Sequence, residues 1–513
     1  MLKRHRHSEG TMGTKLTGTM WSQLFQQHAK SGMSLQGNIR QMLVSAILDG
    51  QLPVGIPLSS SRELSAQLGV ARNTVVLAYQ QLVDEGYLVS RERSGYFVNA
   101  DILAGRTPAQ TTPRDSTPAN GPNWERRFVF RPTKQRNIVK RANWQDYPYP
   151  FIYGQYDPIL FPTADWRECS LKALSVLDIH EWAQDMILRD DDLLVQQIRT
   201  RVLPRRGVWA SADEIVITVG AQQALYLLAD LLVSPDTPVG VEDPGYPDAR
   251  NIFSSRSGHL LPLPIDEEGL MVSRALHSCD YVYVTPGHQC PTTVTMPLAR
   301  RQALLQMAEE ADFVLIEDDY ESENRFHGDH TPTLKSLDRN NRVIYVGSLS
   351  KNLAPGLRIG YIVGPAELIA ELRGIRRLML RHPSAYIQRA FALFLSLGHY
   401  DSHHRRLSAA YRERAQVLSD ALARHLPEVH PVPISGGASC WIVGPDWLDA
   451  EELAQRAEEN GVLIEPGNVF FMKTAMPRNC FRLGFSSIPI EKIEPGIRTL
   501  AEVIHHLKPT RAR

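Results

Sequence analysis

A lysine that follows an apolar run is the residue of this sequence best placed to do chemistry. Lys351 comes shortly after the apolar residues 343–346, with Ser348 and Ser350 just before it and Arg358 seven residues after it. A lysine amine can form a Schiff base with the aldehyde of pyridoxal phosphate. The hydroxyls and the arginine can hold the phosphate. The sequence therefore predicts Lys351 as the covalent anchor of this cofactor, with Ser348, Ser350 and Arg358 as phosphate ligands.

Acidic and aromatic residues that suit the cofactor's ring stand near the ends of other predicted strands. Asp318 and Asp319 close an apolar run, and a carboxylate there can pair with the pyridinium nitrogen, although the spacing leaves both candidates open. Tyr320 follows and can reach the phenolic oxygen of the ring. Tyr246 offers an aromatic face for stacking. We therefore expect these side chains to surround the ring.

Two other positions suit the anionic groups of the ligands. Ala221 and Gln222 follow Gly220 where a predicted strand gives way to a helix, so backbone N–H groups and the helix dipole can meet the phosphate. Arg482 lies within a short apolar strand. A buried arginine needs an anionic partner, and the carboxylate of a substrate or effector would serve.

The residues before position 100 have the order of a winged helix-turn-helix. Apolar residues recur at every fourth position from Leu35 to Ile47, which predicts a helix that ends at Gly50. Ser60 and Glu63 form a capping box that opens a short helix over 62–68. A second helix over 72–85 follows, and the β-prone runs 87–89 and 96–98 predict a hairpin.

In a helix-turn-helix, the first residues of the second helix meet base edges in the major groove. Here these are Arg72, which suits guanine, Asn73, which suits adenine, and Thr74, which suits phosphate or a methyl group. Arg62 is placed for a phosphate, and the tip of the hairpin could enter the minor groove. The predicted DNA-contacting residues are Ser61, Arg62, Arg72, Asn73, Thr74, Arg91 and Gly95.

The charge is unevenly spread along the 513 residues. Basic and acidic residues total 56 each, but residues 1–150 hold 19 basic and 10 acidic ones, a net charge of +9 that suits a polyanion.

No apolar run approaches the roughly 18–20 residues that span a bilayer, and the start lacks the apolar core of a secretory signal. The five cysteines form no close pairs, which argues against a metal or disulfide framework and favours a cytoplasmic location.

Composition divides the chain into four segments. We expect a flexible leader over 1–30, the DNA-binding module over 31–100, a linker rich in Pro, Thr, Arg and Asn over 101–148, and a body over 149–510. In the body, short apolar strands alternate with longer helical stretches, which indicates an α/β domain with a largely parallel sheet. The fold class is therefore multidomain, with an N-terminal winged helix-turn-helix, a large α/β domain and a small α+β C-terminal subdomain.

Several short motifs carry a family resemblance. The N-terminal part reads LSSSRELS at 58–65, LGVARNTV at 68–75, EGYL at 85–88 and SGYFV at 94–98, and these motifs resemble the GntR family of bacterial repressors. Together with the set around Lys351, the chain from 35 to 505 resembles the MocR/GabR-type subfamily, whose body is a fold-type I aminotransferase. The resemblance implies the pyridoxal phosphate roles given above, with Asp318 as the pyridinium partner and Arg482 holding the effector's carboxylate.

The resemblance also implies a function. It describes a cytoplasmic homodimer that binds operator DNA and senses an amine or amino acid through an external aldimine. A sensor of pyridoxal phosphate that controls vitamin B6 synthesis and an active aminotransferase with a DNA-binding domain are the alternatives. The sequence HQCPTT at 288–293 departs from the HNPTG of aminotransferases, because the asparagine that contacts the ring oxygen is absent and Thr293 replaces the closing glycine. This departure favours a sensor over efficient transamination.

Overall fold

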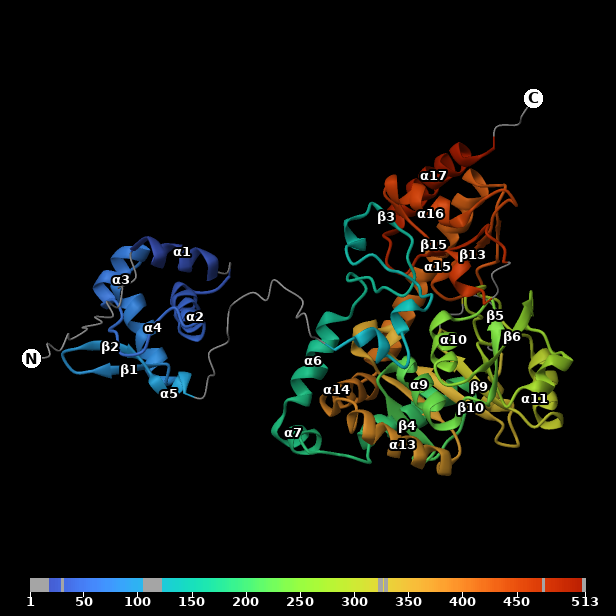
Figure 1. Ribbon diagram of the computed structural model, residues 1–513, viewed down its shortest axis with the longest axis horizontal. Helices are drawn as coiled ribbons and strands as arrows, with labels where there is room; N and C mark the ends of the chain where they lie inside the picture. Colours follow the sequence, from blue (N-terminus) through green and yellow to red (C-terminus); the bar gives the residue numbers. More distant parts are fainter. Residues whose placement is uncertain are drawn as a thin grey trace, which may run out of the picture. The chain divides into compact units, whose positions relative to one another are not determined.

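The structure of this chain is a computed structural model that describes residues 18–28, 32–104, 122–321, 326, 331–472 and 476–509. The chain separates into two compact units, Met1–Asn123 and Trp124–Arg513 (Figure 1). Within the described residues, no helix combines the length and apolar character needed to cross a membrane.

The first unit is a winged helix-turn-helix, as the sequence predicts. The capping box at Ser60 and Glu63 is present, and Gly69 ends the first helix of the motif in a left-handed conformation that allows the turn. Val75, Tyr79 and other residues of the second helix pack into the core. The elements are α1 (Gly18–His28), α2 (Leu35–Leu48), α3 (Ser61–Leu68), α4 (Arg72–Asp84), β1 (Leu88–Arg91), β2 (Gly95–Val98) and α5 (Ala100–Leu103).

Helix α1 differs from the predicted leader over 1–30. Residues 18–28 form a helix whose Trp21 is almost fully buried in the core of the unit, so the prediction is wrong for this stretch. The Ser22 hydroxyl donates to the Gln67 carbonyl of α3 at 3.2 Å. The stretch is only eleven residues long, and three apolar side chains, those of Trp21, Leu24 and Phe25, pack on the core, which makes a weak pattern in the sequence. Residues 1–17 and 29–31 lie outside the described residues.

The second unit is built on an eight-stranded sheet with the order β4-β11-β10-β9-β8-β5-β6-β7. The central strands run parallel, whereas β11 is antiparallel to both of its neighbours and β7 is antiparallel to β6. The strands are β4 (Ile215–Thr218), β5 (Pro238–Asp243), β6 (His259–Asp266), β7 (Gly269–Leu270), β8 (Tyr281–Val284), β9 (Val314–Asp319), β10 (Val343–Ser348) and β11 (Gly360–Val363).

Helices cover both faces of this sheet. Successive strand residues point to opposite faces, so that Ile215 and Ile217 join one core while Val216 joins another. The helices of this part are α6 (Thr163–Ala173), α7 (Val176–Trp182), α8 (Asp192–Gln197), α9 (Gly220–Leu232), α10 (Pro247–Ser254), α11 (Leu298–Glu310), α12 (Leu334–Leu337), α13 (Ala366–Leu380) and α14 (Ala385–Ser396). This arrangement confirms the predicted α/β domain.

A smaller α+β subdomain follows, drawn in orange and red in Figure 1. Its four-stranded antiparallel sheet has the order β12-β13-β16-β15, and its largest helices pack together over one apolar core. The elements are α15 (His399–His425), β12 (His430–Pro431), β13 (Ser439–Val443), α16 (Ala450–Glu459), β15 (Glu465–Pro466), η9 (Gly467–Phe470), β16 (Cys480–Gly484) and α17 (Ile490–Leu507), with a short parallel pair of β3 (Tyr149–Pro150) and β14 (Val462–Leu463).

The predicted linker over 101–148 is only partly a linker. Residues from Trp124 belong to the second unit and include the short helical turns η1 (Trp124–Arg126), η2 (Pro132–Lys134) and η3 (Trp144–Asp146). Polar contacts fix this stretch, such as the hydrogen bond of 2.8 Å from the Tyr147 hydroxyl to Glu458. Because such contacts leave no apolar period in the sequence, composition alone predicts a linker there. Residues 105–121 lie outside the described residues.

Two glycines give a test of how tightly β11 packs on α9. A Cβ on Gly360 would lie 2.6 Å from the backbone carbon of Gly220, so one of the two segments would have to move. We expect Gly360→Ala to lower the free energy of unfolding by about 1–3 kcal/mol, measured by denaturant titration. Gly374 lies inside α13 with open space around it, and Gly374→Ala should raise the stability by about 0.5–1 kcal/mol. Equal effects of the two substitutions would contradict this packing.

Candidate cofactor site and DNA-contacting face

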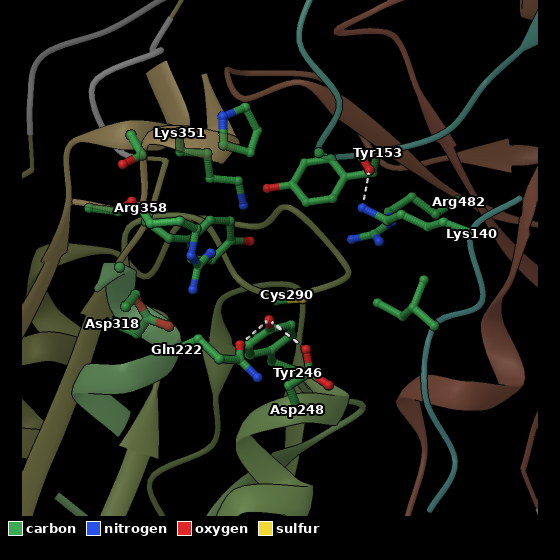
Figure 2. A pocket seen from close by; sticks show the side chains of 18 residues that line it. Lys140, Tyr153, Gln222, Tyr246, Asp248, Cys290, Asp318, Lys351, Arg358 and Arg482 are labelled. Atoms are coloured by element: carbon green, nitrogen blue, oxygen red, sulfur yellow. Dashed lines mark hydrogen bonds between the residues drawn. The ribbon is translucent and has the colours of Figure 1, made fainter. Parts of the chain in front are cut away.

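A cavity of about 330 Å³ lies at the carboxyl ends of the central strands of the second unit. Strands β9, β10 and β4 are close together in the sheet order, so the residues that follow them meet at this edge. All ten predicted ligand-contacting residues line the cavity, namely Ala221, Gln222, Tyr246, Asp318, Tyr320, Ser348, Ser350, Lys351, Arg358 and Arg482 (Figure 2).

The amine of Lys351 sits between aromatic rings. Its Nζ lies 4.3 Å from the ring centroid of Tyr153 and 4.2 Å from that of Tyr320. Burial lowers the pKa of Lys351 below its ordinary value, and the nearby Glu321 carboxylate opposes this effect only partly. A lowered pKa increases the fraction of neutral amine, which is the nucleophilic form.

The structure distinguishes the two neighbouring aspartates. Asp319 is buried in an ion pair with Arg206, at 2.8 Å, and also accepts a hydrogen bond of 2.6 Å from the Tyr345 hydroxyl. Asp318 lines the cavity, and only its Oδ2 is engaged, by the Tyr283 hydroxyl at 2.8 Å. Its Oδ1 is buried without a hydrogen-bond partner among the described residues. Burial raises the pKa of Asp318 to about 6, so a cationic partner would stabilise its carboxylate.

The other end of the cavity has the features of an anion cradle. Gly220 begins α9 with φ of +72°, and the first N–H groups of a helix are free to bind an anion. The Arg358 guanidinium reaches back over this turn and donates to the Val219 carbonyl at 3.1 Å. The Ser350 hydroxyl bonds the backbone of Ile359 and thereby fixes the loop that carries Arg358.

The remaining aromatic and cationic residues enclose the middle of the cavity. The Tyr246 hydroxyl lies 3.0 Å from both the Gln222 amide oxygen and Asp248. The Nε of Arg482 donates to Glu465 at 2.8 Å, so the structure supplies one anionic partner that the sequence did not reveal. The Nη2 of Arg482 is buried without a partner among the described residues.

The loop that departs from the aminotransferase pattern is tightly held. The Gln289 amide donates to the Glu242 carboxylate at 3.2 Å and to the Pro244 carbonyl at 2.9 Å, so its side chain supports the loop. Cys290 is the residue of this loop that lines the cavity. Thr293 has φ of +67°, a conformation that favours glycine, so the threonine occupies a strained position.

Several residues of the cavity wall were not assigned a role from the sequence, and four of them lie within residues 138–154. Ile138 and Lys140 come from the stretch predicted as a linker, and Tyr153 and Gly154 come from the start of the body. The motif that includes Tyr153 and Gly154 resembles the family, but no chemistry of the motif itself indicates a ligand. Ile138 and Lys140 leave no signal in the sequence, because their position depends on contacts with distant parts of the chain.

In the first unit, the structure brings the helix starts of the predicted DNA-contacting face together. The Nε of Arg72 donates to the Ser61 hydroxyl at 3.3 Å, which joins the beginnings of α4 and α3. Arg62 and Asn73 are exposed, and Thr74 is half-buried. At the hairpin tip, the Arg91 guanidinium lies over the Phe97 ring at 4.5 Å, and Gly95 has φ of +97°.

Comparison with known proteins agrees with this architecture. Residues 196–500 match the family described as aminotransferase class I and II, and residues 35–98 match the bacterial regulatory proteins of the gntR family. Among solved structures, a kynurenine aminotransferase from Pyrococcus horikoshii has a TM-score of 0.68 and 28% identity, covering 76% of this chain and 99% of that one.

Regulators resemble the chain over almost its whole length. It is 43% identical to the HTH-type transcriptional regulator TauR of Rhodobacter capsulatus, over 92% of this chain and 96% of that protein. It is 31% identical to the probable rhizopine catabolism regulatory protein MocR of Rhizobium meliloti, over 90% of this chain and 92% of that protein. With its gntR-type DNA-binding domain and its aminotransferase-like body, the chain belongs to the MocR-type transcriptional regulators.

Proposed function

We propose that this regulator binds pyridoxal phosphate in the described cavity and senses an amine or amino-acid effector there. Pyridoxal phosphate, when bound, supplies an aldehyde that condenses with amines and a ring that withdraws electrons. The observation that carries the proposal is the pairing of two features in one cavity. The Lys351 amine is desolvated, and Asp318 has a buried oxygen that lacks a partner among the described residues.

Each group of residues has a separate task in this proposal. Lys351 is the covalent anchor, and its amine lies between two aromatic rings where burial lowers its pKa. Asp318 keeps a proton on the ring nitrogen, Tyr320 contacts the phenolic oxygen and Tyr246 stacks on the ring. The phosphate lies at the start of α9 with Arg358, where Ala221, Gln222, Ser348 and Ser350 complete the cradle. Arg482 binds the carboxylate of the effector.

The regulatory cycle follows from the chemistry of the anchor. An effector amine that takes the place of the Lys351 amine on the cofactor frees the lysine side chain, which changes charge and contacts inside the body. We propose a cytoplasmic homodimer, because two DNA-binding units would engage two half-sites of an operator.

A second candidate function rests on a named relative. The chain is 32% identical to the pyridoxine biosynthesis transcriptional regulator PdxR of Corynebacterium glutamicum, over 79% of this chain. A sensor of the cofactor itself would respond to pyridoxal phosphate without any amine, so operator affinity measured with the cofactor alone separates the two functions. Residual aminotransferase turnover is a third possibility, which a donor amino acid and a keto acid test directly.

Substitution of the anchor tests the cofactor site. We expect wild-type protein reconstituted with pyridoxal phosphate to show the visible absorption band of a lysine-bound cofactor, and Lys351→Ala to lack this band because the anchoring amine is removed. Lys335→Ala is the control, since Lys335 pairs with Asp338 outside the cavity. A band of wild-type strength in Lys351→Ala would overturn the assignment of the anchor.

The raised pKa of Asp318 predicts a pH dependence of cofactor binding. Its carboxylate gains protons as the pH falls through about 6, and the protonated form cannot pair with a pyridinium cation. Affinity for pyridoxal phosphate should therefore weaken below pH about 6. Asp318→Asn should weaken binding by about 2 kcal/mol or more at neutral pH. The affinity of Asp318→Asn for pyridoxal phosphate should also depend less on pH than that of the wild-type protein. Only the contribution of the cofactor's own phosphate should remain. Identical pH profiles of the two proteins would contradict the role of Asp318.

Operator binding tests the DNA-contacting face. Arg72→Ala should weaken binding to fragments that the wild-type protein selects from random DNA by about 1–3 kcal/mol, because a base contact is lost. Arg40 is the matched control in the same unit, since its guanidinium is engaged by Glu85 at 2.6 Å. Fluorescence anisotropy measures both affinities, and the cofactor band monitors folding of the body. Equal losses in Arg40→Ala and Arg72→Ala would contradict the assignment.

A further inference from the structure

Residues 135–141 form a strap along one side of the cavity and connect the two parts of the body. The Gln135 amide donates to the Asn251 carbonyl of α10 at 3.1 Å, and the Arg250 guanidinium donates to the Arg136 carbonyl at 3.1 Å. On the small subdomain, Arg136 donates to the Asn468 carbonyl and Arg141 pairs with Glu458. This strap, residues 135–141, lies outside the segment that matches aminotransferases. In the sequence it follows the DNA-binding unit.

Lys140 extends its ammonium group from this strap into the cavity. Lys140 is exposed as a whole residue, but it lines the cavity, and its Nζ donates to the Tyr153 carbonyl at 2.6 Å. Within the part of the chain that the structure describes, this carbonyl is its one hydrogen-bond partner. An ammonium group has three N–H donors, so two remain available to a ligand. Burial lowers the pKa of Lys140, and a bound anion would restore the charged form.

Arg482 presents a second set of unused donors next to the same tyrosine. Its guanidinium lies 4.2 Å from the Tyr153 ring centroid, and its Nη2 is buried without a partner among the described residues. Figure 2 shows the head groups of Lys140 and Arg482 beside Tyr153, with Lys351 on the other side of the ring. A small ligand could therefore contact Lys351 at one end and both cations at the other.

Two carboxylates near these cations leave their remaining donors free. Glu465 bonds the Nε of Arg482, and its side chain is not part of the cavity wall. Asp248 does line the cavity, but its Oδ2 accepts from the Tyr246 hydroxyl at 3.0 Å. Both raise the pKa of Lys140, while Arg482 lowers it. The unused donors of Lys140 and Arg482 thus favour an anionic group.

We infer that Lys140 and Arg482 together bind the acidic group of the effector, which is therefore an amino acid rather than a simple amine. The inference rests on the proposed cofactor site. It also assigns a regulatory role to the strap, because an effector held by Lys140 bonds directly to the chain segment that follows the DNA-binding unit. Effector occupancy then stabilises the strap against the body.

The experiment compares probes that differ in the acidic group. Full-length protein loaded with pyridoxal phosphate is titrated with glycine, β-alanine, 4-aminobutanoate and propylamine, and the change in cofactor absorption gives each affinity. We expect wild-type protein to prefer at least one amino acid over propylamine. Lys140→Gln should reduce this preference about tenfold or more, as expected for loss of a charge-assisted hydrogen bond, with the response to propylamine unchanged. Lys134→Gln, which removes an exposed charge before the strap, should behave as wild type.

Two further measurements distinguish a failure of this inference from a failure of the proposed cofactor site. A missing cofactor band in wild-type protein without any amine would refute the proposed function itself. Equal responses of the wild-type protein to propylamine and to all three amino acids would overturn the inference. An unchanged preference of Lys140→Gln for amino acids over propylamine would also overturn it, and so would the loss of the cofactor band in that variant. Hydrogen exchange of residues 135–141 should slow when the preferred amino acid is added to wild type and Lys134→Gln, but not to Lys140→Gln.

Discussion

Burial of the Lys351 amine is the constraint on which the rest of the body depends. A cation in a desolvated site is costly, so the surroundings must either pair it or let it lose its proton. Here the nearest groups are the rings of Tyr153 and Tyr320 rather than a close carboxylate. The two rings come from different parts of the chain, the start of the body and the end of β9. The fold must therefore bring the segment that carries Tyr153 onto the strand ends before the Lys351 amine is desolvated.

The carboxylates beneath the cavity show how the fold separates structural from chemical roles. Asp319 and Arg206 form a closed, buried pair that joins β9 to the chain after α8. Asp318, one residue earlier, points to the other face of the sheet, as alternation along a strand requires, and keeps an oxygen for a ligand. Adjacent residues of the same type thus have opposite tasks. The partners distinguish the two roles, since Arg206 and Tyr345 occupy the Asp319 carboxylate and only Tyr283 bonds to Asp318.

Much of this organisation could be predicted from particular residues. The capping box at Ser60, the turn at Gly69 and the apolar strands of the body have local causes, and the structure contains each of them. The set around Lys351 could be predicted to meet because strand ends of a parallel sheet converge. The choice between Asp318 and Asp319 depended on Arg206, which is distant in sequence. Helix α1 was missed because its buried face has only three apolar residues, Trp21, Leu24 and Phe25, and the strap was missed because a few polar contacts produce no periodic pattern.

The strap has a practical consequence for the design of chimeric regulators. A body cut at residue 196, where the aminotransferase match begins, or at 149, where composition suggests a boundary, would lose Ile138 and Lys140 and leave one side of the cavity open. A fusion that exchanges DNA-binding modules should therefore keep everything from Trp124 onward with the body that it came from. The chimeric regulator would then keep the ligand specificity of the protein that supplied the body.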